Sequence, residues 1–165
     1  MEFNHIEADF SYENYSAFMI KELYKYVRAD YCMTIQWDSC IIDGSKWTDR
    51  FLDYDYIGAP WPNQWRNRVG NGGFSWRSKE FLQCSSELYY VKLGVYKEHD
   101  AEDYFVCVTN YEKMLRKGIN FAPIPIASRF CVEHPIPELP HNYDELSSYH
   151  SFAFHGAFNI AGLNY

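Results

Sequence analysis

Strand-like and helix-like patterns alternate along this 165-residue chain, and this alternation limits its fold more than any other feature. Apolar side chains recur at helical spacing over residues 11–27, and Ser11 stands where a helix N-cap is expected. An apolar run over residues 31–43 follows and includes Asp38 and Asp43 toward its end. This run predicts a buried strand that emerges into a polar site.

The middle of the chain predicts a second strand and a second helix. The short strand is expected from Tyr54 to Ala59, because Pro60 cannot donate to a sheet ladder. The stretch VGNGGFSWRSKEF then places a glycine-rich turn before a helix over residues 78–90. A glycine cluster in a well-patterned domain predicts a special backbone conformation or a close approach by another group.

The last third continues the alternation. A helix is predicted over residues 101–117, with acids in its first turn and bases in its last, and strands are predicted over residues 119–127 and 151–158. The proline-rich segment 134–142 between these strands predicts a loop. The expected fold is therefore a single α/β domain over residues 1–165, with a mostly parallel sheet flanked by helices.

Composition narrows the class of protein. The chain is 47% hydrophobic and 19% aromatic, which is ample for a core, and its net charge is −7. Nucleic-acid binding is disfavoured because a basic footprint is missing. Five cysteines without a CxxC pair favour reduced thiols. No apolar run resembles a signal peptide or a membrane span, so the expected location is the cytoplasm.

Four polar groups lie at the ends of predicted elements: Asp38, the loop from Gly70 to Ser75, the pair Glu102 and Asp103, and His155. Each has a simple structural explanation when taken alone. An aspartate after a strand commonly serves a turn, acids in a first helical turn favour the helix dipole, and a histidine between aromatics commonly belongs to the core. Arg77 is a candidate phosphate partner, although an ordinary ion pair explains it about as well.

Together these groups resemble a known family. The ordered segments are similar to glycosyltransferase-like domains of the GT-A class that are often described only as a domain of unknown function (DUF5672-like). The resemblance extends from about Ser11 to Gly156 and rests on six segments in the same order: QWDSCIID, YDYIGAPW, VGNGGFSWRS, AEDYFVC, FAPIPIASRFCVE and SFAFHG. It implies a compact, N-terminally shortened GT-A-like (Rossmann-like) fold.

The resemblance also implies roles for particular residues. Asp38 and His155 would hold a divalent metal, Mn²⁺ or Mg²⁺, on the diphosphate of a nucleotide-sugar donor. Asp103, with Glu102 in the same motif, would act as the catalytic base. The loop beside the donor sugar would be made of Gly70, Asn71, Gly72, Gly73, Phe74 and Ser75.

These roles are chemically consistent with sugar transfer to a glycan or another hydroxyl acceptor. A metal neutralises the departing diphosphate, and a carboxylate takes the proton of the acceptor hydroxyl. Two departures from the class are visible. Gln36 opens the acidic motif where an aspartate is usual, and only 37 residues precede Asp38, so the usual nucleotide pocket is expected to be shortened.

These departures leave alternatives open. The leading expectation is an inverting, metal-dependent glycosyltransferase. A non-catalytic sugar- or nucleotide-binding module and a metal-assisted hydrolase of phosphoesters or nucleotide sugars remain as alternatives. The shortened N-terminal part would leave a sheet edge open, which predicts self-association or a partner chain that completes the nucleotide site.

Overall fold

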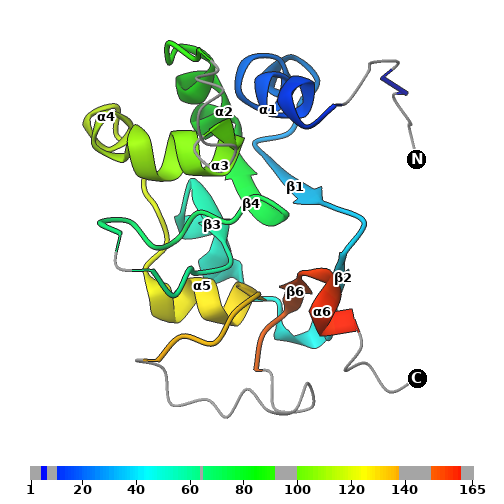
Figure 1. Cartoon of the computed structure of the whole chain (residues 1–165). Helices are drawn as coiled ribbons and strands as arrows, with labels where there is room; N and C mark the ends of the chain where they lie inside the picture. Colours follow the sequence, from blue (N-terminus) through cyan, green and yellow to red (C-terminus); the bar gives the residue numbers. More distant parts are fainter. Residues whose placement is uncertain (1–4, 7–10, 64, 92–99, 138–149, 161–165) are drawn as a thin grey trace.

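A computed structural model of the chain describes residues 5–6, 11–63, 65–91, 100–137 and 150–160. Its strands form two small three-stranded sheets, one with the order β1-β4-β3 and the other with the order β2-β6-β5. Helices lie on both sides of the first sheet (Figure 1). The molecule is therefore a mixed α/β protein.

The first sheet is entirely antiparallel. Its central strand, β4 (Phe74–Ser78), pairs on one side with β1 (Tyr31–Ile35) and on the other with β3 (Tyr56–Gly58). Trp76 of β4 lies opposite Met33 in one neighbour and Ile57 in the other. Because β1 pairs only with β4, it is an edge strand of this sheet.

The second sheet is smaller and contains the one parallel pair among the named strands of the described residues. Its central strand, β6 (Ala153–His155), is antiparallel to β2 (Ser39–Ile41) and parallel to β5 (Cys131–Val132). The predicted mostly parallel, Rossmann-like sheet is therefore wrong. The alternation of strands and helices was present, but most neighbouring strands run in opposite directions.

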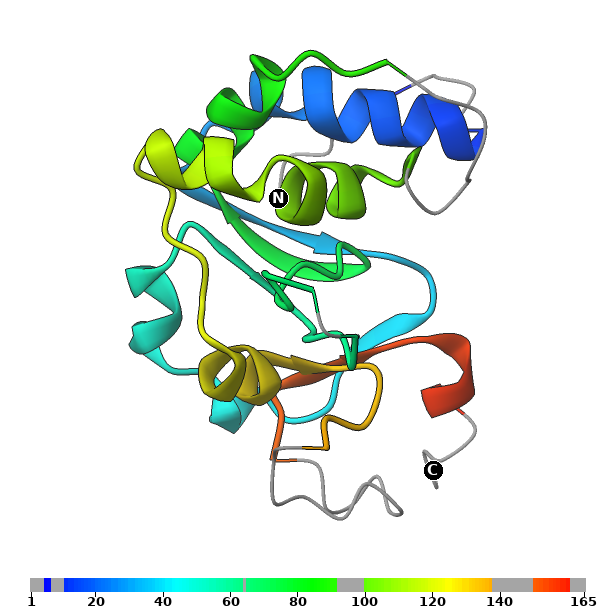
Figure 2. The same ribbon diagram turned by 60° about the vertical axis from the view of Figure 1, so that its left-hand side comes forward.

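Helices cover the first sheet as a layer (Figure 2). The helices on one side are α1 (Tyr12–Lys21), α2 (Lys79–Ser86), α3 (Glu102–Tyr104) and α4 (Tyr111–Arg116). The other side holds α5 (Ile124–Phe130) and the second sheet, which is followed by α6 (Ala157–Ile160). The first sheet is thus the middle layer of the molecule.

The hydrophobic core is divided by this middle layer. Successive residues of a strand point to opposite faces of a sheet, and Tyr56 and Ile57 of β3 accordingly join different buried clusters. Tyr56 packs with Phe81 on the helical side, whereas Ile57 packs in the cluster that contains Phe130 of α5. Each face of the first sheet therefore has its own core.

Several predicted boundaries change in the structure. The predicted strand over residues 31–43 breaks at a turn, so that β1 and β2 belong to different sheets. The predicted helix over residues 101–117 consists of α3, a π-helical segment (Phe105–Thr109) and α4. Part of the predicted strand over residues 119–127 is helical, because α5 begins at Ile124.

The glycine-rich stretch leads into a strand that the sequence pattern did not predict. β4 follows Gly73 directly, and α2 begins only at Lys79, where the Ser78 side chain accepts a hydrogen bond from the Phe81 N–H at 2.9 Å. The helix ends at Ser86 instead of reaching residue 90. The predicted last strand is confirmed only over residues 153–155, which form β6, because α6 begins at Ala157. Residues 138–142 of the predicted loop lie outside the described residues.

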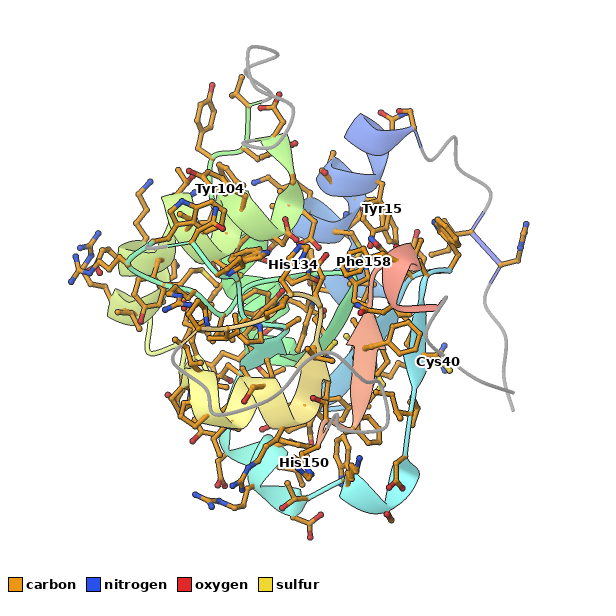
Figure 3. The ribbon with its side chains drawn as sticks, turned by 60° about the horizontal axis from the view of Figure 1, so that its bottom comes forward. Tyr15, Cys40, Tyr104, His134, His150 and Phe158 are labelled. Carbon is orange, nitrogen blue, oxygen red and sulfur yellow. The ribbon has the colours of Figure 1, made fainter. Side chains whose placement is uncertain are left out.

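All five cysteines are free thiols in the structure. Cys107 and Cys131 are buried, and burial raises the pKa of both well above the usual value. Cys40 is exposed and lies at the outer side of β2 (Figure 3). The chain therefore contains both core thiols and an accessible one.

Candidate functional site

His155 ends the central strand of the second sheet, and both of its ring nitrogens face acceptor groups. Its Nδ1 lies 3.1 Å from Oε1 of Glu133, and its Nε2 lies 3.3 Å from Oε1 of Gln36 and 3.4 Å from Oδ1 of Asp38. The pairing of β6 with β2 fixes this position, since His155 is opposite Ser39, the residue after Asp38. The structure therefore brings Asp38 and His155 together, as the resemblance implied.

Asp38 occupies the turn between β1 and β2. Its backbone carbonyl accepts a hydrogen bond from the Gly156 N–H at 3.0 Å, which ties this turn to the end of β6. Its Oδ1 atom is buried and accepts no hydrogen bond from the described residues. Its contact with Nε2 of His155, at 3.4 Å, is an ion-pair contact without hydrogen-bond geometry. A buried carboxylate oxygen without a donor is costly unless another group satisfies it.

Glu133 is a site residue for which the sequence suggested no role. It follows β5, and its two oxygens serve different partners: Oε1 faces His155, and Oε2 accepts from Nδ2 of Asn71 at 2.7 Å. The Asn71 side chain in turn accepts from the Gly73 N–H at 3.0 Å. Glu133 thereby fixes the orientation of the imidazole and links it to the glycine-rich loop.

The acids around His155 control its charge. Burial of the imidazole lowers its pKa, but Glu133, Asp38 and Asp103 together outweigh burial, so the pKa of His155 is raised above its usual value. The protonated ring donates through Nδ1 and directs its second N–H at the acceptors beside Nε2. A cation that binds at Nε2 would have to displace that proton.

Protein atoms explain why Gly73 lacks a side chain. A Cβ atom at this position would lie 2.0 Å from Nε2 of His155, so the imidazole occupies the space that a side chain would need. At Gly72 a Cβ would lie 2.3 Å from Oε1 of Glu102. These contacts, and not an approaching sugar, are sufficient to require glycine at both positions.

This packing makes Gly73→Ala a sharp test of the position of His155. We expect the variant to lose about 1–3 kcal/mol of unfolding free energy, because the new methyl group overlaps the imidazole. Gly44→Ala is the matched control, since its Cβ would meet no atom within 4 Å. Thermal unfolding and the imidazole NMR signals of His155 measure the two effects. Unchanged His155 signals in the Gly73 variant would contradict this position.

The rest of the predicted glycine loop is occupied by internal contacts. A Cβ at Gly70 would collide with the Trp61 ring, Phe74 is a core residue, and Ser75 is buried with its hydroxyl 2.8 Å from Nε of Arg77. Among the described residues, only Gly73 of this six-residue set lines the cavity described below. The loop thus acts mainly as a scaffold for the site.

Arg77 and Glu102 form a buried ion pair. Nη2 and Nη1 of Arg77 lie 2.7 Å and 3.1 Å from the two carboxylate oxygens of Glu102, and the Arg77 side chain is 1% exposed. Arg77 also donates to the Gly72 carbonyl at 3.4 Å. Since both of its oxygens are held by Arg77, Glu102 serves to fix the loop, and Arg77 is not a surface residue that awaits a phosphate.

Asp103 is held next to this pair. Its Oδ2 accepts from the Gly72 N–H at 2.9 Å, and its Oδ1 accepts from the Tyr104 N–H at 2.7 Å. Burial, followed by the nearby Glu102 carboxylate, raises the pKa of Asp103 to about 6, against the opposing effect of the two N–H groups. A carboxylate with this pKa can accept and return a proton near neutral pH.

One cavity connects these groups. It has a volume of about 700 Å³, within the range of small-molecule sites, and its polar lining includes Gln36, Gly73, Asp103 and His155. Tyr15 projects from α1 toward the sheets (Figure 3), and its hydroxyl accepts from Nε2 of Gln36 at 3.2 Å. Asp103, a potential base, and His155 therefore line one cavity, whereas Asp38 and Glu133 contact the imidazole but are not among the lining residues.

The fold and the site define a mixed α/β protein with a cavity lined by residues of α1 and β1 together with Asp103 and His155. The chain belongs to the family described as "Protein of unknown function (DUF5672)", which matches residues 1–155. No curated protein matches it. Among the helices of the described ranges, none combines the length and the apolar character that a membrane crossing requires.

Proposed function

We propose that this chain is a metal-dependent glycosyltransferase that moves a sugar from a nucleotide-sugar donor to an acceptor hydroxyl. The observation that carries the proposal is the shared cavity, which is lined by both Asp103 and His155, the imidazole of which contacts Asp38 at 3.4 Å. The proposal concerns the reaction and does not depend on a parallel, Rossmann-like sheet.

The residues around Asp38 are suited to a divalent cation. Asp38 and His155 would hold it, and Gln36 supplies a neutral oxygen beside them. The unsatisfied Oδ1 of Asp38 also fits this role. When bound, Mn²⁺ or Mg²⁺ would neutralise negative charge on a diphosphate.

Asp103 would supply the base. Its carboxylate takes the proton from the acceptor hydroxyl, whose oxygen forms a bond to the anomeric carbon of the donor sugar. The bond from that carbon to the phosphate oxygen breaks, and the nucleoside diphosphate leaves with the electron pair. The Gly72 and Tyr104 N–H groups hold the carboxylate in place during this exchange. Direct displacement by the acceptor would invert the anomeric centre.

The proposal is tested with a panel of nucleotide sugars and Mn²⁺, with transfer and donor hydrolysis both measured. We expect turnover that depends on the cation, and Asp38→Asn should weaken Mn²⁺ binding at least about tenfold in calorimetric titration. Asp49→Asn is the control, since Asp49 is an exposed acid at the start of a 3-10 helix (Asp49–Asp53) and does not line the cavity. The absence of both turnover and cation binding in the parent would refute the proposal.

A second candidate, a non-catalytic sugar- or nucleotide-binding module, is favoured by one observation. The described part of the chain contains no group of three or more His, Cys, Asp or Glu side chains that could hold a metal. A protonated His155 between Glu133 and Asp38 would satisfy the site without a cation. Donor binding that is independent of Mn²⁺ and leads to no product would support this candidate over the enzyme.

A further inference from the structure

The edge strand β1 has backbone groups that point away from its sheet. At its two ends, the Lys79 N–H donates to the Asp30 carbonyl at 2.7 Å and the Gln36 N–H donates to the Gly73 carbonyl at 2.8 Å. In an antiparallel pair, alternate residues direct both backbone groups to the same side. The even-numbered residues therefore face β4, and Tyr31, Met33 and Ile35 direct their N–H and C=O groups outward.

No strand of the described residues covers this outer side of β1. Edge strands are commonly protected by charged side chains or proline, but the segment between Asp30 and Asp38 contains neither. Ile35 and Trp37 are 55% and 84% exposed. The edge is therefore open and rich in residues that favour strand pairing.

The cavity of the candidate site runs along this edge. Residues 32–37 all line it. Since the side chains of a strand alternate between two faces, contact with every consecutive residue places the cavity beside the edge and not over one face. The opposite wall comes from α1, at Tyr15, Ser16 and Met19. Figure 1 shows α1 and β1 on the same side of the molecule.

The candidate base lies at the end of this groove. Gln36, directly after β1, is bound to Gly73, and the neighbouring Gly72 is bound to Asp103. A chain that pairs along β1 would therefore extend toward Asp103 and His155, which line the same cavity. The carboxylates at this end also favour a ligand with positive charge.

We propose that the open edge of β1 binds an extended polypeptide by adding it to the sheet as a further strand. The next part of the inference rests on the proposed function. The peptide carries the acceptor hydroxyl on a serine or threonine that reaches Asp103. The backbone of the peptide satisfies the outward groups of Tyr31, Met33 and Ile35. Because α1 forms the other wall of the 700 Å³ cavity, the space suits a single extended chain better than the edge of a second folded sheet.

The first test measures binding of the synthetic peptide acetyl-Lys-Val-Thr-Val-Thr-Val-Lys-amide by fluorescence anisotropy with a labelled version. We expect saturable binding and increased amide-exchange protection at Tyr31, Met33 and Ile35. A control peptide with proline in place of the adjacent third and fourth residues, Thr and Val, has the same charge but lacks one N–H group on each of its two sides, and it should not bind in either register. Equal binding of both peptides, or unchanged protection at β1, would overturn the proposal.

The second test changes the protein at one position. Met33→Pro removes an N–H group that the β1–β4 ladder does not use, so the sheet is retained while the outer edge is blocked. We expect peptide affinity to fall at least tenfold, and Met33→Leu, which keeps the N–H group, to remain close to the parent. If the proline variant does not fold, amide exchange of the parent protein with and without the peptide decides whether the peptide binds along β1.

The outcomes separate this inference from the proposed function. Peptide binding without sugar transfer from any donor would support the peptide site and count against the transferase. Sugar transfer to a small acceptor without peptide binding would support the transferase and count against the peptide site. A parent protein that is dimeric in sedimentation and becomes monomeric with Met33→Pro would assign the edge to a second copy of this chain, and would overturn the peptide proposal.

Discussion

Replacement of Asp103 by asparagine is expected to lower sugar transfer about 10²- to 10⁴-fold, the range of a general base, while donor binding is retained. The amide keeps the size of the side chain and can still accept from the Gly72 N–H, but it cannot take a proton. Initial rates with a nucleotide sugar and Mn²⁺ measure the loss. Asp30→Asn, at an exposed acid before β1, is the control and should retain the parent rate.

The pH dependence of the same pair gives an independent check. With the pKa of Asp103 at about 6, the parent rate should rise between pH 5 and 7, and the variant should lose this rise.

The stability of the parent should change with pH in the opposite sense to its rate. A carboxyl whose pKa is higher in the folded state than in the unfolded state loses stabilisation as pH rises through 6. Asp103→Asn should therefore gain stability relative to the parent at pH 8, and an unchanged pH profile would contradict the assignment.

Loss of Arg77 is expected to cause the largest change in stability. Arg77→Met leaves the Glu102 carboxylate buried without its partner, which should lower the unfolding free energy by about 3–5 kcal/mol. The double variant Arg77→Met with Glu102→Leu removes both charges and should recover much of that loss. Denaturant unfolding of the parent, the two single variants and the double variant measures the coupling. Additive losses would show that the two side chains act independently.

The local patterns predicted some elements well and misassigned others for identifiable reasons. The first helix and the strand at β3 were found because their apolar spacing is regular. The segment that forms α5 was predicted as a strand because apolar residues alternate with Pro123 and Pro125. Proline is equally compatible with the start of a helix: Pro125 lies in the first turn of α5, and Pro123 is its N-cap residue.

The central strand β4 could not be recognised from its own residues. Two serines and Arg77 interrupt the apolar pattern of FSWRS. Burial of Arg77 becomes acceptable only because Glu102, far away in the chain, neutralises it. A local sequence window does not include that partner, and without β4 the pairing direction of the first sheet could not be derived.

The candidate site was predicted in part. Asp38 and His155 were expected to meet, and they lie 3.4 Å apart. Glu133 was not expected, although it ends one of the segments that carry the family resemblance. Its role depends on the parallel pairing of β5 with β6, which places it beside His155. The partner of a carboxylate at a strand end can be predicted only once the neighbouring strands are known.

The division of the site between two sheets has a consequence for how the protein would lose activity. Asp103 is fastened through Gly72 to the larger sheet, whereas His155 and Glu133 belong to the smaller one, whose strands are only two or three residues long. Cys131 and Ala153 of the smaller sheet are nevertheless fully buried, in the same hydrophobic cluster as Ile57 and Phe74 of the larger sheet. Segments that share a buried core open together and at high free energy. We therefore expect His155 and Asp103 to separate only when this shared core unfolds, so that inactivation on heating coincides with denaturation.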